Sequence, residues 1–369
     1  MKTETATKND IPEMLDFIFS AFRVENPEHP RFETLYPDLF VHTDEAAACH
    51  LVVRKDDKIV SCVGSYPMTL SLAGCRIPLA GIGQVSTALA MRGRGCMSLL
   101  LNDSIRKMEQ DGVALSWLGG RHDRYSKFDW EIVAGGFTFF FGGNILRTMD
   151  ANIFVSQSLG TSAEITDDMF KMREASATVV EPHQNFRMRL GRSEAEVWVA
   201  HRRCPGEIAA WAVLYPKSRK IADFCGSHDG ILQILKSAAF KLGGINICVS
   251  SADKGLTEKL RMECTYMGFA AQTLLVVSLK KTIESYADYL AAQTPKDFGV
   301  TLRMKRPDGT AEDADIGKGG KVVELDRKRM ARLLFGPERA GEVPGVPPNI
   351  HELNTIFPLP FALPELFHV

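Results

Sequence analysis

The segment Val85–Met97 reads VSTALAMRGRGCM, an apolar run that leads through a glycine-bearing turn into the start of a helix. Gly93 and Gly95 occupy the turn, and apolar residues continue beyond it at helical spacing. Such a helix start leaves several backbone N–H groups unpaired at the positive end of the helix dipole. A diphosphate fits there, because glycine lets phosphate oxygens approach the backbone. Arg92 and Arg94 add positive charge.

Other phosphate-binding motifs match this segment poorly. A P-loop requires G-x-x-x-x-G-K-[ST], a run that the sequence does not contain. A dinucleotide fingerprint requires a third glycine at the position of Ser98. A basic turn that only begins a helix, with no ligand, is the remaining alternative.

The elements around this segment predict a mixed α/β (α+β) unit over residues 1–147. Asp10 and Pro12 begin a helix, and apolar runs separated by turns at residues 56–57 and 73–74 follow. After the glycine turn we expect a helix, a strand, a short helix and a last strand. The runs read as strands are His50–Val53, Ile59–Ser65, Met68–Leu72, Ile77–Ala90, Val113–Leu118 and Phe137–Phe141, with the short helix at Tyr125–Ile132.

Residues 148–281 repeat part of this order. A turn at Cys204–Gly206 joins two strands, and Gly230–Leu242 and Gly255–Tyr266 read as helices. Ala271–Leu279 reads as the final strand of this second unit. Because no glycine-rich loop precedes its first helix, the unit should not bind the same ligand. The remaining strands are expected at Val197–Arg202, Ile208–Tyr215, Ile221–Phe224 and Ile245–Ser250.

Residues 282–369 predict a smaller, less regular part. Val300–Met304 and Lys321–Leu325 read as strands separated by a polar turn, between helices at Ile283–Ala291 and Arg327–Phe335. The chain ends in the apolar tail Ile356–Val369, which contains three prolines. A stiff apolar tail loses little entropy on docking, so we expect it to be buried.

The composition is that of a soluble globular protein. Of 369 residues, 45% are hydrophobic and 24% charged, and the net charge of −1 gives no general attraction to nucleic acid or to a membrane. The eight cysteines form no C-x-x-C pair, and the amino terminus has no apolar core typical of a signal peptide. We therefore expect a cytoplasmic protein.

The glycine turn resembles the pyrophosphate loop of GNAT acetyltransferases, R/Q-x-x-G-x-G/A, with Arg92 and Gly95 in place and Met97 at the last position. The run Tyr125–Glu131 resembles the Y-x-x-F-G-[YWF]-E segment of the enhanced-intracellular-survival subgroup, with Asp129 replacing glycine. The ending Phe357–Pro360 resembles bacterial members. The resemblance covers nearly the whole chain. It implies a second, degenerate GNAT-like unit, a small sterol-carrier-like carboxy-terminal domain and a homo-oligomer.

The resemblance implies acetyl-CoA as co-substrate and no metal. Backbone groups of Val85, Ser86 and Thr87 would contact the cofactor, and Gly120 and Arg121 would meet it again. The residues implied to cradle the pyrophosphate are Arg92, Gly93, Arg94, Gly95, Cys96 and Met97.

Amide formation from a thioester requires a neutral amine, a polarised carbonyl and a proton for the departing thiolate. The resemblance assigns the proton to Tyr125 and assigns amine deprotonation to the carboxylate of the chain terminus at Val369. A tyrosine and a tail buried only for packing are the alternatives. Other candidate bases are Glu365 and His368 in the tail, and His122 and Asp123 beside Tyr125.

The expected function is transfer of acetyl from acetyl-CoA to a primary amine of a small molecule or peptide. A protein on the same scaffold that binds CoA or lipid without catalysis is the alternative, since Met97 and Asp129 depart from the family pattern. A metal hydrolase is disfavoured because no H-E-x-x-H motif occurs. The acidic residues Glu25, Glu28, Glu33 and Asp38 would suit a cationic acceptor, although exposed loop charges are the commoner explanation of such residues. A catalytic Cys96 is less favoured than a thiol that faces the helix core.

Overall fold

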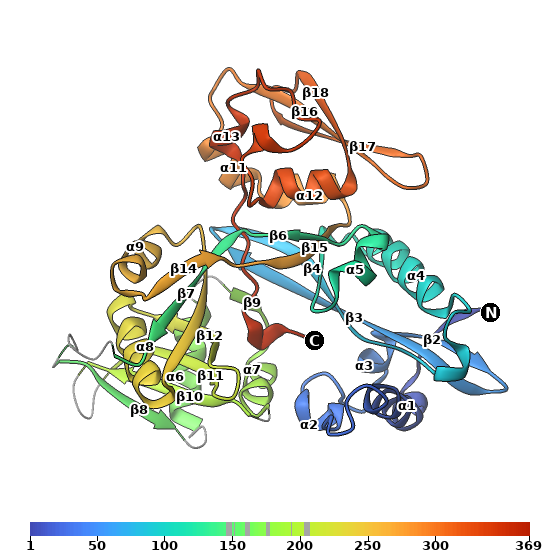
Figure 1. Ribbon diagram of the computed structural model, residues 1–369, viewed down its shortest axis with the longest axis horizontal. Helices are drawn as coiled ribbons and strands as arrows, with labels where there is room; N and C mark the ends of the chain where they lie inside the picture. Colours follow the sequence, from blue (N-terminus) through green and yellow to red (C-terminus); the bar gives the residue numbers. More distant parts are fainter. Residues whose placement is uncertain (145–149, 151, 159–162, 175–177, 193, 203–206) are drawn as a thin grey trace.

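The computed structural model describes residues 1–144, 150, 152–158, 163–174, 178–192, 194–202 and 207–369. Two large sheets lie side by side, and a smaller part sits above them (Figure 1). This architecture confirms the expected mixed α/β class. The turn expected at Cys204–Gly206 lies outside the described residues.

The first sheet has the strand order β1-β2-β3-β4-β5-β15-β6 among the described residues, with β9 beside β3. Residues 56–57 and 73–74 have positive φ, which confirms the two expected hairpin turns. The two runs expected between them form one strand, β3. Strand bounds are β1 (Thr3–Thr5), β2 (His50–Lys55), β3 (Lys58–Leu72), β4 (Cys75–Thr87), β5 (Leu115–Leu118), β6 (Glu131–Val133), β9 (Thr178–Val180) and β15 (Gln272–Val276). Helix bounds are α1 (Ile11–Arg23), α2 (Phe32–Leu35), α3 (Asp44–Ala48), α4 (Cys96–Gln110) and α5 (His122–Tyr125).

The second sheet has the order β14-β7-β13-β12-β11-β10-β8 over the described ranges. Its helix α8 starts at an N-cap serine, Ser227, and ends at Gly243, which has φ +73. Strand bounds are β7 (Gly136–Gly142), β8 (Phe154–Ser158), β10 (Glu196–His201), β11 (Ile208–Tyr215), β12 (Lys220–Gly226), β13 (Gly244–Ser250) and β14 (Tyr266–Phe269). Helix bounds are α6 (Ala163–Glu174), α7 (His183–Leu190), α8 (His228–Leu242) and α9 (Lys254–Glu263).

The two sheets share one pairing pattern and exchange a strand. When the first sheet is counted from β1 and the second from β8, the fourth and fifth strands of each are parallel, as β4–β5 and β12–β13. The other neighbours in the strand order are antiparallel. β7 lies between β13 and β14, whereas β15 lies between β5 and β6. Phe137–Phe141 was expected to end the first unit and Ala271–Leu279 to end the second. These predictions were wrong, because β7 belongs to the second sheet and β15 to the first. The helix expected over Tyr125–Ile132 was also wrong, because α5 ends at Tyr125 and β6 follows.

The third part is a three-stranded sheet, β17-β16-β18, covered by helices. The segment expected as a polar turn contains strand β17, whose alternating exposed and buried residues fit an edge strand. Asp326 caps α12 by accepting from the Arg329 amide at 2.8 Å, and Gly336 ends it. Bounds are β16 (Gly299–Lys305), β17 (Ala311–Gly317), β18 (Lys321–Asp326), α10 (Leu279–Ser285), α11 (Ala287–Gln293), α12 (Arg327–Phe335) and α13 (Leu353–Ile356). No helix among the described residues is long and apolar enough to span a membrane.

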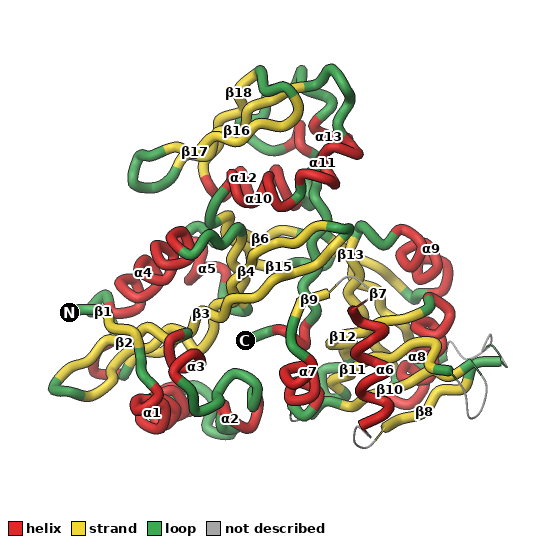
Figure 2. Tube along the Cα trace, turned by 180° about the vertical axis from the view of Figure 1, so that it is seen from behind, coloured by secondary structure: helices red, strands yellow, loops and turns green. Residues whose placement is uncertain are grey.

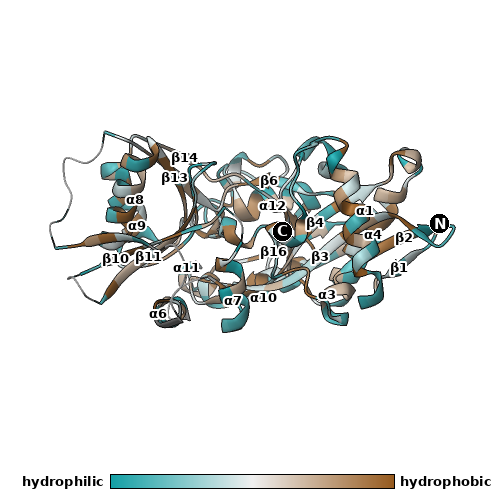
Figure 3. Ribbon diagram, turned by 90° about the horizontal axis from the view of Figure 1, so that it is seen from below, coloured by the Kyte–Doolittle hydropathy of each residue, from teal (hydrophilic) through white to brown (hydrophobic). Residues whose placement is uncertain are grey.

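The apolar tail passes from the third part to a position between the two large sheets, where the chain ends (Figures 1, 2 and 3). As its composition predicts, the tail is buried. A Cβ at Gly135 would lie 2.4 Å from the Phe361 nitrogen, so this glycine allows the tail to cross the linker between β6 and β7. Each large buried side chain contributes about 2 kcal/mol of hydrophobic stabilisation. The apolar tail side chains with 3% exposure or less are Ile356, Phe357, Leu359, Phe361, Leu363, Leu366 and Phe367.

Candidate active site

A cavity of about 860 Å³ opens where β4 and β5 separate. Their parallel ladder runs from Leu79–Leu115 to Ile82–Leu118, where β5 ends, while β4 continues to Thr87. The cavity is lined by the end of β4, the turn before α4, the residues after β5 and the chain terminus. The end of β4 leads almost directly into the turn before α4, so three segments that are distant in sequence share one site.

The turn before α4 can accept phosphate oxygens. Gly93 and Gly95 have φ +74 and +80, and a Cβ at either would meet no atom within 4 Å. Gly95 is the N-cap of α4, and no side chain among the described residues caps this helix. The first amides of a helix have no partner within it, and these amides border the cavity at Gly95, Cys96 and Met97. The turn thus fits a diphosphate at the positive end of the helix dipole.

The two arginines and the cysteine of the turn lie in different surroundings. Arg92 lines the cavity and forms an ion pair of 3.3 Å with Glu25 on the opposite wall. Arg94, expected in the same cradle, is exposed and is not among the described residues that line the cavity. Cys96 is 1% exposed, which fits a thiol packed in the helix core better than a nucleophile.

A bulge in β4 displaces the strand next to the cavity. Cys62 pairs with Ser86 whereas Gly64 pairs with Gly83, so one residue of β3 faces two of β4. Gln84 occupies this bulge with φ 48, and its buried side chain accepts a hydrogen bond of 2.5 Å from the Tyr66 hydroxyl. A positive φ strains the backbone of a residue other than glycine, and such strain persists where surrounding contacts hold the backbone in place. The bulge directs the backbone of residues 85–87 along the cavity wall.

Tyr125 is buried at the end of α5 and lines the cavity. Burial raises the pKa of its hydroxyl, an effect that the neighbouring Arg124 partly opposes. A Cβ at Gly120 would lie 2.7 Å from the Tyr125 ring, so the glycine lets the chain after β5 pass closely over it. Gly120 and Arg121 also line the cavity, and Arg121 is ion-paired with Asp123 at 2.7 Å. Because burial raises its pKa, the Tyr125 phenol stays protonated at neutral pH.

The chain terminus rests against β4. A Cβ at Gly83 would lie 2.8 Å from the terminal carboxyl carbon of Val369, and one at Gly81 would lie 2.7 Å from its side chain. The two glycines therefore make room for the last residue. Val369 and Tyr125 line the same cavity, as expected for the proposed base and acid.

A buried arginine fixes the tail. Arg192 donates to the backbone carbonyls of Leu366 at 2.6 Å and His368 at 3.0 Å, and makes two bonds of 2.8 Å to Asp38. Phe367 packs between the guanidinium groups of Arg173 and Arg189. These contacts join the tail to the loop after α2.

Asp38 differs from its expected role as an acidic residue for the acceptor. Its side chain is 1% exposed and ion-paired with Arg189 and Arg192. Burial alone would raise the pKa of this carboxyl, but hydrogen bonds from Arg192 and the charge of Arg189 lower it. Asp38 therefore holds the arginines. The end of α1, α2 and the residues between and just after them contribute Phe22, Glu25, Asn26, His29, Phe32 and Tyr36 to the cavity wall.

The other candidate bases are engaged elsewhere. His368 stacks on Trp117 at 4.1 Å, and burial together with Lys220 and Arg192 lowers its pKa to about 3. Glu365 is ion-paired with Lys220 at 2.9 Å. Neither tail residue lines the cavity among the described residues, and the same is true of His122 and Asp123.

Sequence reasoning missed Arg192, Gln84 and the pair Gly81 and Gly83. Alternate glycines in an otherwise apolar strand were a signal of close approach by another backbone. An arginine in a second unit gave no comparable signal, because its partners lie more than 150 positions away in sequence.

Residues 2–133 match the family model described as an acetyltransferase (GNAT) domain. The expected enzyme class, an acyl-CoA-dependent acetyltransferase, is confirmed at the level of this domain. No curated protein sequence matches the chain. Among the described residues, no group of three or more His, Cys, Asp or Glu side chains is arranged to hold a metal.

Three solved structures share the fold over almost the whole chain. A probable N-acyltransferase from Enterococcus faecalis V583 is 14% identical, with 98% of this chain and 97% of that chain covered at a TM-score of 0.70. A GCN5-related N-acetyltransferase from Kribbella flavida is 17% identical, with 100% and 98% covered at 0.65. Eis1 from Mycobacterium abscessus is 14% identical, with 99% and 98% covered at 0.66.

Proposed function

We propose that this protein is an N-acetyltransferase that transfers acetyl from acetyl-CoA to a primary amine by direct attack. The observation that carries the proposal is one cavity lined by the turn before α4, the displaced end of β4, Tyr125 and the chain terminus. The amine belongs to a small molecule or a peptide.

The turn before α4 would bind the diphosphate through the amides of Gly95, Cys96 and Met97, and Arg92 would add charge. The backbone of residues 85–87 would bind the adjoining arm of the cofactor along the open edge of β4. Bound acetyl-CoA supplies an activated acyl carbon and a thiolate leaving group. These contacts align the acyl carbon with the acceptor, and such positioning supplies much of the rate.

Tyr125 would donate a proton to the departing sulfur. Its raised pKa keeps the hydroxyl protonated at neutral pH, as a general acid requires. A backbone N–H within residues 85–87 would stabilise negative charge on the carbonyl oxygen. No covalent bond to the protein is needed.

The carboxylate of Val369 would accept a proton from the incoming ammonium group, directly or through water. An alkyl ammonium has an unperturbed pKa of about 10.4, so a base assists at neutral pH. Arg192 holds the two preceding carbonyls, which fixes where this carboxylate lies.

The division into units 1–147, 148–281 and 282–369, the sterol-carrier-like assignment of the last unit and a homo-oligomer belong to the same proposal. The shared pairing pattern of the two sheets supports a repeated unit. Asp129, which replaces a glycine of the family pattern, has φ +69, so this aspartate accepts the backbone conformation that glycine would supply.

Binding of acetyl-CoA by calorimetry, followed by thiol release with a panel of primary amines, tests the proposal. We expect binding and thiol release with at least one amine. Tyr125→Phe should bind acetyl-CoA with unchanged affinity and turn over about 100-fold more slowly. Binding without thiol release for any amine would favour the non-catalytic alternative, and an unchanged rate would remove Tyr125 from the mechanism.

A further inference from the structure

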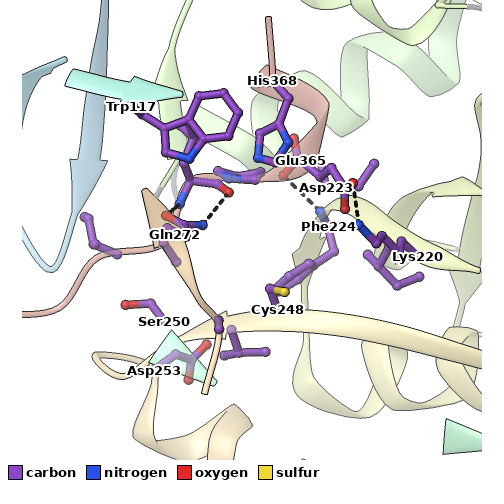
Figure 4. A pocket seen from close by; sticks show the side chains of 18 of the residues that line it. Trp117, Lys220, Asp223, Phe224, Cys248, Ser250, Asp253, Gln272, Glu365 and His368 are labelled. Carbon is purple, nitrogen blue, oxygen red and sulfur yellow. Dashed lines mark hydrogen bonds and ion pairs between the residues drawn. The ribbon is translucent and has the colours of Figure 1, made fainter. Parts of the chain in front are cut away.

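A second cavity, of about 670 Å³, lies between the two large sheets beside the tail. It is lined by β12, the end of β13, the start of β15 and the tail from Ala362 to Glu365 with His368 (Figure 4). None of these segments takes part in the chemistry proposed above.

This cavity occupies the place in the second sheet that the active-site cavity has in the first. β12 and β13 are parallel and share a single register pair, Lys220–Asn246, before they separate. The helix that follows β12 is a poorer seat for a diphosphate than α4, because the Ser227 hydroxyl already accepts from the Gly230 amide at 3.2 Å. Asp229 adds negative charge in its first turn. A CoA-type ligand is therefore disfavoured here.

The charged side chains that line the second cavity are each paired. Lys220 is bound to Glu365 at 2.9 Å, and Asp223 to Arg173 at 3.1 Å. Asp253 accepts from the Leu256 amide at 2.9 Å. A charged ligand group would have to compete with these existing partners, and burying a charge without a partner is costly. An apolar group suits the remaining walls, which include Trp117, Ile221, Phe224, Val249, Leu363 and Pro364.

The two cavities meet beside the proposed base. Gly119 and Gly120 line both. His368 faces the second cavity, whereas Val369, the next residue, lines the active-site cavity. The stacked pair of Trp117 and His368 forms a wall at this junction. The two cavities therefore adjoin at Gly119 and Gly120, next to the Val369 carboxylate, and a ligand that occupies both would cross this boundary.

We propose that the second cavity binds the apolar portion of the acceptor, so that the substrate is an amphipathic amine with a hydrocarbon or aromatic body. The proposal rests on the acetyltransferase function. The primary amine would lie at Val369, and the apolar body would displace water from the walls formed by Phe224 and Val249.

Cys248 provides a binding readout that needs no catalysis. It lines the second cavity and is exposed, whereas Cys264 is partly exposed and is not among the described residues that line it. We expect n-octylamine to slow alkylation of Cys248 by iodoacetamide at least about fivefold, with no effect on Cys264. Ethylamine should protect neither cysteine.

Turnover gives the second readout. Because each buried methylene adds to binding, the KM of n-octylamine should be at least about tenfold below that of ethylamine. Ala271→Trp extends an exposed side chain of the cavity wall, so it should abolish this difference and leave the KM of ethylamine unchanged.

The outcomes separate the two proposals. Protection of Cys248 by n-octylamine without acetylation of either amine would contradict the acetyltransferase function and this use of the cavity, leaving only an apolar binding site. Acetylation of both amines without protection of Cys248, or with equal KM values, would overturn the amphipathic acceptor alone. Protection by octanoyl-CoA but not by n-octylamine would assign the cavity to the acyl chain and overturn the proposal.

Discussion

The two large sheets differ most at the start of the helix that follows the fourth strand of each. Before α4, two glycines with positive φ leave the first amides open to the active-site cavity. Before α8, the Ser227 hydroxyl accepts a hydrogen bond from the Gly230 amide, and Asp229 is paired with Lys259. The same strand order thus supports a diphosphate seat in one unit and a closed helix start in the other. Ligand binding here follows from a few residues at a helix terminus, because the sheet topology is shared.

The two units also differ in which residues of the tail they contact. Its last residue reaches the cleft of the first sheet, where Gly81 and Gly83 make room, whereas the preceding residues line the cleft of the second sheet. The chain terminus thus adds a carboxylate to the cavity of the first unit.

The largest effect should come from lengthening the chain. Three alanines appended after Val369 would move the carboxylate away from β4 and crowd the cleft of the first sheet. We expect acetylation to fall by about 100-fold or more, since a general base contributes that much. Unfolding by urea and acetyl-CoA binding should change little. Full activity of the extended chain would eliminate the terminal carboxylate as base.

Substitutions at the two helix starts test the comparison between units. Gly95→Val places a β-branched residue at φ +80, so we expect the Kd of acetyl-CoA to rise at least about tenfold. Ser227→Ala removes the cap of α8 and should cost about 1 kcal/mol of stability with no change in that Kd. Equal losses of acetyl-CoA affinity in both variants, measured by calorimetry, would contradict the assignment of the seat to the first unit.

The contact between the units can be weakened without removing charge. Lysine in Arg192→Lys cannot reproduce the paired bonds to Asp38 and to the tail carbonyls. We expect kcat to fall about tenfold while the KM of acetyl-CoA stays constant. Arg187→Lys is the control, because Arg187 lies on α7 shortly before Arg192, is exposed and pairs with Asp167. A parallel loss of kcat and of acetyl-CoA affinity in Arg192→Lys would indicate a general structural role.

The last effect is a pH dependence of stability that arises beneath the β4 bulge. Burial lowers the pKa of His50 to about 4, so the folded protein keeps it neutral while the unfolded chain binds a proton below about 6.5. The contribution of neutral His50 to the free energy of unfolding is therefore present above pH 6.5. It is lost as the pH falls towards 4, at about 1.4 kcal/mol per pH unit.

Urea unfolding at pH 7 and pH 5 measures this contribution. His50→Gln should show a smaller loss of stability between the two pH values than the unchanged protein. The idea fails if both proteins lose the same stability.

Much of the first unit could be predicted from local patterns. Hydrophobic spacing and turn residues gave β2 to β5, α1 and α4, and the glycine turn before α4 lines the cavity as expected. The apolar, proline-rich tail predicted its own burial. These features depend on residues close together in sequence.

Non-local features could not be predicted in the same way. β7 and β15 are apolar strands that fit either sheet, and only the packed structure determines which neighbour each one pairs with. The carboxylate of Asp38 looked like an exposed loop charge because its arginine partners lie on α7 and just after it, in the second unit. The second cavity depends on the tail lying between both sheets.

Amide hydrogen exchange with saturating acetyl-CoA compares the two helix starts in one experiment. We expect slower exchange at residues 93–98, where the amides would bind the diphosphate, and unchanged exchange at residues 227–231. No protection of residues 93–98, or protection of residues 227–231 in their place, would contradict the central claim that the first unit alone binds the cofactor.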